Sequence, residues 1–161
     1  MKKVIFDTDI GIDDAMALLF LHHAPDVDLI AITTGFGNAS VSDTTRNALY
    51  MKELFNMSAA VYAGAAMPVG SALGEGYADF VHGKNGLGDI PLTTPMCEAE
   101  AMPAAEVIVE LVRANPRALS VVAVGRMTNL AMALALEPKL PSLVKELVVM
   151  GGVFGYNGHR G

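Results

Sequence analysis

Five short apolar runs are spaced along the chain and predict buried β-strands. Within each run the apolar residues follow one another instead of alternating with polar ones. That pattern is typical of strands covered on both faces, as in a parallel sheet between helices. The runs cover residues 4–6, 29–33, 60–63, 119–124 and 147–150.

Segments with apolar residues at helical spacing lie between these runs. They cover residues 13–23, 42–56, 103–114 and 128–136. Ser42 or Asp43 is suited to cap the second segment, and Pro103 is suited to a first helical turn. Strands that alternate with helices predict an α/β fold: an open, mostly parallel central sheet flanked by helices, with right-handed crossovers.

Residues 64–102 are the main irregularity, because they are rich in glycine and proline and show no clear periodicity. A connection longer than about 12–15 residues in a compact domain is usually functional or mobile. We predict a flap that covers a substrate, with a disordered excursion as the alternative. No repeat or linker divides the chain, so residues 1–161 are expected to form a single α/β domain.

Composition narrows the class of protein. The chain has 161 residues, 52% of them hydrophobic, which is incompatible with intrinsic disorder. Its net charge of −6 argues against a nucleic-acid partner, which needs a basic face. The single Cys97 excludes a disulfide framework and a cysteine-rich zinc site. The sequence has no long uncharged apolar run, and acidic residues interrupt the stretch that a signal peptide would need, so we expect no membrane span and a cytoplasmic location.

Four carboxylates, Asp7, Asp9, Asp13 and Asp14, fall within eight residues directly after the first predicted strand. Ligands of open α/β sheets bind beyond the carboxyl ends of the strands, so the cluster lies where a site is expected. Burying such close like charges raises their pKa values unless a cation neutralises them, and oxygen ligands suit calcium or magnesium. Asp13 or Asp14 could instead cap a helix, but capping does not explain Asp7 and Asp9.

Other motifs that contain aspartates fit less well. An EF-hand loop counted from Asp7 would need glycine and glutamate where Ile12 and Leu18 stand. No phosphate-binding glycine motif follows the strand. A strand that ends in Asp-x-Asp is also similar to haloacid-dehalogenase-type phosphohydrolases, with Asp7 as nucleophile and Asp9 as acid/base. Those proteins usually continue with Gly-Thr, and the paired aspartates at 13 and 14 have no part in that scheme, so this is a remote alternative.

Residues 7–15, Asp-Thr-Asp-Ile-Gly-Ile-Asp-Asp-Ala, resemble the DTDPGxDDA signature of inosine–uridine-type nucleoside hydrolases, with Ile10 in place of the usual proline. Further segments resemble that family in the same order along the chain. They are residues 33–38, 44–48, 82–88 (the HGxxGLG flap), 124–131 (the TGPLTNLA loop) and 149–152. The resemblance covers essentially the whole chain and implies a nucleoside hydrolase-like fold with a Rossmann-like core.

The resemblance also implies a chemistry: hydrolysis of the N-glycosidic bond of ribonucleosides to ribose and free base, as in purine or pyrimidine salvage, by a calcium-activated water. By similarity, Asp9 is both metal ligand and general base, and Asp14 is a second metal ligand. Val124 stands where the family usually has a threonine whose main-chain carbonyl binds the metal. Asp13 would hydrogen-bond a ribose hydroxyl, and Asp7 would support its neighbours.

Four further residues acquire expected roles from the resemblance, each beside a plainer alternative. Asn38 would contact the sugar or the metal-bound water, or would simply occupy a turn. Met150 would pack against ribose, or belong to the core. His82, in the flap, would contact or protonate the leaving base, or lie exposed in a loop. Asn129 would cap a helix or support the loop.

The family's chains run further than residue 161, so the resemblance is to their N-terminal portion. The chain is therefore expected to work as a hydrolase on a small nucleoside substrate, as a homo-oligomer or with a complementary C-terminal fragment. The alternative is a truncated or inactive fragment that binds metal or assembles with that second half. Residues 151–161 look like a site loop. The preference between purines and pyrimidines stays open.

Overall fold

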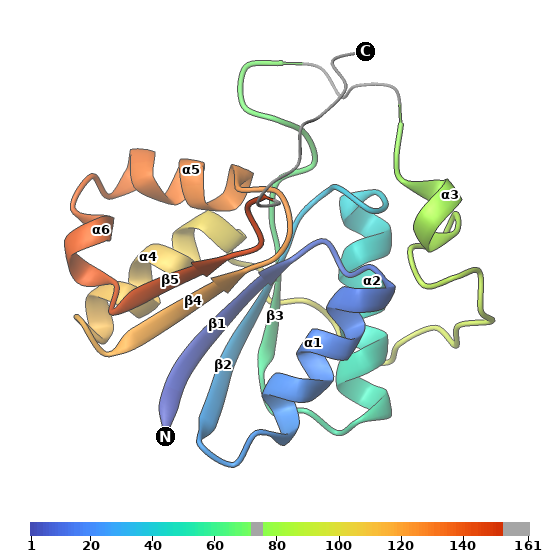
Figure 1. Ribbon diagram of the computed structural model, residues 1–161, viewed down its shortest axis with the longest axis horizontal. Helices are drawn as coiled ribbons and strands as arrows, with labels where there is room; N and C mark the ends of the chain where they lie inside the picture. The colour runs from blue at the N-terminus through green and yellow to red at the C-terminus, as the bar shows by residue number, and fades with distance from the viewer. Residues whose placement is uncertain (72–75, 153–161) are drawn as a thin grey trace.

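The computed structural model describes residues 1–71 and 76–152. Its centre is a five-stranded sheet in the order β3-β2-β1-β4-β5, and every neighbouring pair of strands is parallel (Figure 1). The strands are β1 (Lys2–Thr8), β2 (Val27–Thr34), β3 (Ala60–Ala63), β4 (Leu119–Ala123) and β5 (Glu146–Val149). This open parallel sheet confirms the predicted α/β class.

Helices cover both faces of the sheet (Figure 1). Successive side chains of a strand point to opposite faces, so β1 buries Phe6 in one apolar cluster and Ile5 in the other. The first cluster includes residues of α1 (Ile12–His23) and α2 (Val41–Leu54). The second includes residues of α4 (Ala104–Ala114), α5 (Thr128–Leu136) and α6 (Leu140–Leu143). Burial from both sides is why the strands read as continuous apolar runs.

Some local details differ from the sequence prediction. The side chain of Ser40, and not that of Ser42 or Asp43, caps α2 by accepting the Asp43 N–H at 3.1 Å. Two helices of four residues, α3 (Asp79–His82) and α6, were not predicted, because one turn is too short to show a helical period. Helix α3 lies inside the expected flap, residues 64–102. Within the part of the chain that the structure describes, no helix is long and apolar enough to cross a membrane.

The strand order places a topological switch point at the carboxyl end of β1. The chain leaves β1 towards β2 on one side, whereas β4 lies on the other, so the connections diverge between β1 and β4. Open α/β sheets bind their ligands at such a switch point. Asp9 follows β1 and Gly125 follows β4, so both lie at this switch point.

Candidate active site

Two buried carboxylates lie close together beyond the end of β1, and one asparagine donates a hydrogen bond to each of them. Asp9 is 6% exposed and Asp14 is 2% exposed. The main-chain N–H of Asn38, in the loop after β2, donates to Asp9 Oδ2 at 2.9 Å, and its Nδ2 donates to Asp14 Oδ2 at 3.1 Å. The Gly11 N–H also donates to Asp14 Oδ2 at 2.8 Å, so Asp14 caps the start of α1 as well.

Two glycines allow neighbouring loops to approach Asp9 closely. A Cβ atom at Gly37 would overlap the Asp9 carboxylate. A Cβ atom at Gly125 would lie 2.8 Å from the Asp9 nitrogen and 3.1 Å from its Oδ1. The loop after β4 therefore abuts Asp9. The Val124 N–H in that loop donates to the main-chain oxygen of Asp7 at 2.9 Å, which keeps Val124 beside the carboxylates.

The electrostatics favour a positive partner at this point. Burial, followed by the charge of Asp14, raises the pKa of Asp9 above its usual range, and burial likewise raises the pKa of Asp14. Paired carboxylate oxygens suit a hard divalent cation, so the residue types fit calcium. Among the described residues, however, no three His, Cys, Asp or Glu side chains are grouped to hold a metal. These residues thus provide two carboxylates, which is part of a ligand set.

Asp7 is buried behind this pair and belongs to a separate polar network. It is 1% exposed, and its Oδ1 accepts from Thr33 Oγ1 at 2.6 Å and from Asn129 Nδ2 at 2.9 Å. Burial raises the pKa of Asp7 to about 6. Asn129 also donates to the Thr34 oxygen at 3.0 Å and accepts from the Ala65 N–H at 2.9 Å. Asn129 therefore ties together the ends of β1 and β2 and the chain after β3, and its side chain does not cap α5.

His82 brings the flap to the start of α1. Its Nδ1 accepts the Ile12 N–H at 3.2 Å and lies 3.9 Å from Asp13 Oδ1. Because Nδ1 acts as an acceptor, the proton of a neutral imidazole lies on Nε2. The side chain of Asp13 is 65% exposed and that of His82 is 13% exposed, so Asp13 is the carboxylate open to a solute.

The rest of the described flap includes an ordered turn held to α2. Asn47, fully buried in α2, donates through Nδ2 to the Asn85 oxygen at 2.7 Å. The side-chain oxygen of Asn85 accepts from the N–H groups of Leu87 at 2.9 Å and Asp89 at 3.0 Å. Hydrogen bonds thus shape the glycine-rich segment and fasten it beside the site.

Met150 follows a different strand from the residues of this constellation. It follows β5 at the same end of the sheet, where its N–H donates to the Ala123 oxygen at 2.9 Å, and it is 60% exposed. The predicted residues that the structure brings together are Asp9, Asp13, Asp14, Asn38 and His82, with Val124 adjacent. The residues that sequence reasoning missed are Thr33 and the pair Arg126–Phe36, whose guanidinium carbon lies 5.0 Å from the ring centroid. Of the expected site loop at 151–161, residues 153–161 lie outside the described part.

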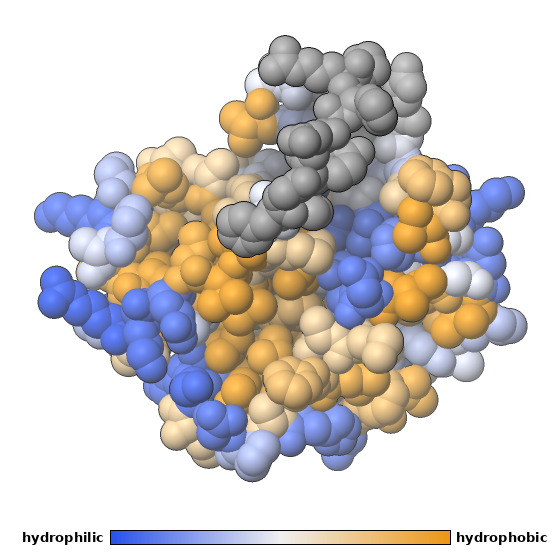
Figure 2. All heavy atoms as spheres, viewed as in Figure 1, coloured by the Kyte–Doolittle hydropathy of each residue, from blue (hydrophilic) through white to orange (hydrophobic). Residues whose placement is uncertain are grey.

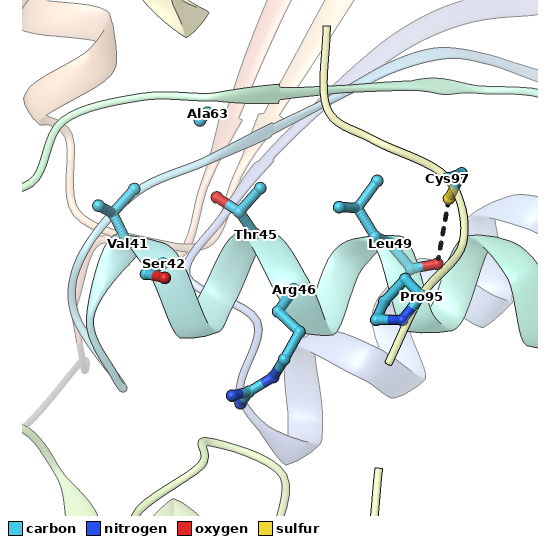
Figure 3. Close-up of a pocket in the computed structure, with 8 residues that line it drawn as sticks. All are labelled: Val41, Ser42, Thr45, Arg46, Leu49, Ala63, Pro95 and Cys97. Atoms are coloured by element: carbon cyan, nitrogen blue, oxygen red, sulfur yellow. Dashed lines mark hydrogen bonds between the residues drawn. The ribbon is translucent and has the colours of Figure 1, made fainter. Parts of the chain in front are cut away.

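A separate pocket of about 320 Å³ lies against α2 (Figure 3). Thr45 and Leu49 of α2 line it together with Pro95 and Cys97. Burial raises the pKa of the Cys97 thiol, which does not favour a reactive thiolate. None of the aspartates lines this pocket, and we assign it no chemistry.

Comparisons with known proteins agree with the geometry. Residues 4–161 match the family described as inosine-uridine preferring nucleoside hydrolase. The chain is 41% identical over 154 residues to uridine nucleosidase 1 of Arabidopsis thaliana, covering 95% of this chain and 46% of that protein. It is 35% identical over 159 residues to the inosine-uridine preferring nucleoside hydrolase of Crithidia fasciculata, covering 97% and 49%. Among solved structures, the plant nucleoside hydrolase PpNRh1 superposes with a TM-score of 0.93 at 38% identity, covering 98% of this chain and 50% of that one. The chain spans about half the length of the curated relatives it matches.

The buried Asp7 carboxyl predicts a pH dependence of stability in the presence of a chelator. Its folded pKa of about 6 lies above the usual value of 3.8, so the folded state binds this proton more tightly. Stability from this group is fully present below about pH 4 and is lost as the pH rises through about 6. Asp7→Asn should remove this loss, which amounts to up to about 3 kcal/mol, in urea titrations from pH 4 to 8.

Asp7→Ala serves as the matched variant. It removes the same ionisation but also the acceptor of Thr33 and Asn129, so it should be less stable than Asp7→Asn at every pH by about 1–3 kcal/mol. An Asp7→Asn protein with the pH profile of the unmodified protein would contradict the assignment.

Proposed function

The chain belongs to the inosine-uridine preferring nucleoside hydrolase family, and on this basis we propose that it carries the catalytic carboxylates for hydrolysis of the N-glycosidic bond of ribonucleosides. The products are ribose and a free base. The observation that carries the proposal is the buried Asp9–Asp14 pair, bridged by Asn38 at the switch point of the sheet. The family match also sets aside the phosphohydrolase alternative.

The proposed roles follow from the charge that develops during the reaction. Cleavage of a glycosidic bond passes through an oxocarbenium-like state, which negative charge near the sugar stabilises. Asp9, with its raised pKa, accepts the proton of the attacking water. Asp13, the exposed carboxylate beside the pair, accepts a hydrogen bond from a ribose hydroxyl. Asn38 keeps the two buried carboxylates in place and faces the same site.

A calcium ion bound by Asp9, Asp14 and the main-chain oxygen of Val124 would supply the positive charge that acidifies the attacking water. The support for calcium is the chemistry of the donors: two buried carboxylates whose raised pKa values reflect unneutralised burial and repulsion. Calcium takes about six to eight oxygen ligands, so the described residues supply part of the set. Waters, substrate hydroxyls or further polypeptide supply the others.

Asp9→Asn tests the proposal most simply. It removes the proposed base and one negative charge while the side chain keeps its size and can still accept from the Asn38 N–H. Release of reducing sugar from inosine and uridine, measured with calcium, should fall by about 10²–10⁴-fold without comparable loss of folding. A chelator should abolish the activity of the unmodified protein.

The matched control is Asp26→Asn, which changes an exposed carboxylate in the turn before β2 and should leave the rate unchanged. Equal turnover by Asp9→Asn would contradict the role of Asp9. Absence of turnover by the unmodified protein with calcium would favour the alternative of an inactive, metal-binding fragment.

His82 is the proposed group on the side of the leaving base. The Ile12 N–H donates to its Nδ1, which leaves the Nε2 N–H free to donate a hydrogen bond to the leaving base as negative charge develops on it. The Asn47–Asn85 hydrogen bond fixes the flap that carries it. Met150 is proposed to pack on the ribose from the end of β5. A cytoplasmic location and assembly into oligomers remain predictions.

A choice of substrates separates a hydrogen bond from His82 to the leaving base from a structural role. His82→Ala should lower kcat for inosine or uridine by about 10²-fold. The same change should barely affect 4-nitrophenyl β-D-ribofuranoside, whose leaving group departs without a proton. Equal losses on both kinds of substrate would contradict a hydrogen bond from His82 to the leaving base and point to misplacement of the flap.

A further inference from the structure

The helix that ends at His82 is packed only loosely against the rest of the molecule. Helix α3 buries none of its four residues, and Phe80 is 92% exposed. Figure 2 shows hydrophobic surface where Figure 1 places α3, with hydrophilic surface beside it towards the start of α1. Packing of α3 therefore contributes little to the position of His82. That position depends on the contacts of His82 itself and on the turn that follows it, residues 83–89.

Residues 83–89 form a turn that its own hydrogen bonds close. The main-chain oxygen of His82 accepts from the Gly88 N–H at 2.6 Å, and the side-chain oxygen of Asn85 accepts from the Leu87 N–H at 2.9 Å. The Leu87 side chain is buried in the apolar cluster that includes residues of α1 and α2. The turn is therefore one unit that begins at His82 and is docked on the core.

Asn47 fastens this turn to α2 through a buried hydrogen bond. Its Nδ2 donates to the main-chain oxygen of Asn85 at 2.7 Å. Its Oδ1 accepts from Arg46 Nη2 at 3.2 Å, which orients the amide so that Nδ2 points to Asn85. Arg46 Nη1 is held in turn by Asp43 Oδ1 at 2.8 Å. Asparagine is a poor residue for the middle of a helix, and a buried amide is costly without partners. The hydrogen bond to the turn therefore accounts for asparagine at position 47.

The turn lies directly on Asn47, and its first residue lies directly on the start of α1. A Cβ atom at Gly86, whose φ is +81°, would lie 3.0 Å from Asn47 Nδ2. A Cβ atom at Gly11 would lie 2.8 Å from Nδ1 of His82, the atom that accepts the Ile12 N–H. Both contacts are too close for an intervening side chain. A shift of the turn away from Asn47 would therefore also move the imidazole away from Gly11.

We propose that Asn47 is a positioning residue for His82. Through its hydrogen bond to Asn85 it keeps the turn docked before a substrate binds, so that the imidazole is already in place to donate to the leaving base. Ordering the donor in advance removes that cost from the reaction step. The inference rests on the proposed role of His82, but it concerns a residue of α2 that lies outside the constellation of carboxylates.

The competing explanation is that Asn47 only stabilises the fold. A purely structural residue would change the stability of the whole domain and would slow the reaction of every substrate alike. A positioning residue acts through His82, so its loss should loosen the turn locally and should have no further effect once His82 is absent. Two measurements separate these explanations.

Amide hydrogen exchange measured by NMR tests the position of the turn without any substrate. Asn47→Leu keeps a similar volume and suits a helix, but it removes the donor to Asn85. The N–H groups of Gly88 and Ile12, which donate to His82, should then exchange about tenfold faster through local opening. Asn47→Ala, a smaller second variant, should give the same result, and circular dichroism checks the folding of both.

Thr44→Val is the matched control. Thr44 is also fully buried in α2, and its hydroxyl donates to the Gly35 oxygen at 2.8 Å, so the variant removes a different buried hydrogen bond with little change of shape. It should lower the stability of the domain to a similar extent but leave the local exchange of the Gly88 and Ile12 N–H groups unchanged.

Kinetics test whether Asn47 acts through His82. Asn47→Leu should lower kcat for inosine by about tenfold, with little effect on 4-nitrophenyl β-D-ribofuranoside. The double variant with His82→Ala should be no slower on inosine than His82→Ala alone, because the group that Asn47 positions is then absent.

Three results would overturn the proposal. They are unchanged exchange of the Gly88 and Ile12 N–H groups in Asn47→Leu, equally fast exchange in Thr44→Val, and a double variant that is slower than His82→Ala by the full factor of Asn47→Leu. Absence of turnover by the unmodified protein would instead count against the proposed function. The exchange measurement would still decide whether Asn47 positions His82, because it needs no substrate.

Discussion

The constraint on which the site depends is the burial of three carboxylates, Asp7, Asp9 and Asp14, within eight residues of chain. Each resists burial as an anion, and the charge of Asp14 further raises the cost of ionising Asp9. Hydrogen-bond donors from separate elements stabilise the carboxylates. They are Asn38 after β2, Asn129 of α5 and the Gly11 N–H before α1. These donors reduce the free-energy cost of burying the ionised carboxylates without removing it, since the pKa values of all three aspartates remain raised. Because the hydrogen bonds only partly stabilise the negative charges, this end of the sheet is suited to bind a cation.

The parallel sheet is what makes so many donors available at one point. Because the five described strands run in the same direction, their carboxyl ends lie at the same end of the sheet. The loops after β1, β2 and β4 converge there. Two apolar layers, one on each face, hold the strands in register and leave that end free for polar groups. Among the described residues, β5 forms one edge of the sheet, although its apolar side chains suit an interior position.

Short apolar runs and helical periods were enough to predict the five strands, and four of the six helices, that the structure describes. The aspartate cluster was also predictable, since helix capping accounts for only one or two of four carboxylates that follow a buried strand. Helices α3 and α6 were missed because one turn carries no period. Support of the loop by Asn129 was one of two predicted alternatives, but its partners could not be predicted, because they are remote in sequence and meet only in the folded sheet. The exposure of β5 could not be predicted either, because its apolar sequence is typical of a strand that is buried on both faces.

Asp9 and Asp14 are thus proposed to form a cation site, and burial beside Asp14 raises the pKa of Asp9 to about 7 when the cation is absent. Calorimetric titration of the protein with calcium at about pH 6.5, in buffers of different ionisation enthalpy, measures the protons exchanged on binding. We expect calcium to bind with release of protons, because the cation favours the ionised carboxylates. Asp9→Asn should weaken the binding and reduce the release. Binding without proton release, or no binding of calcium, would contradict a cation site at this pair.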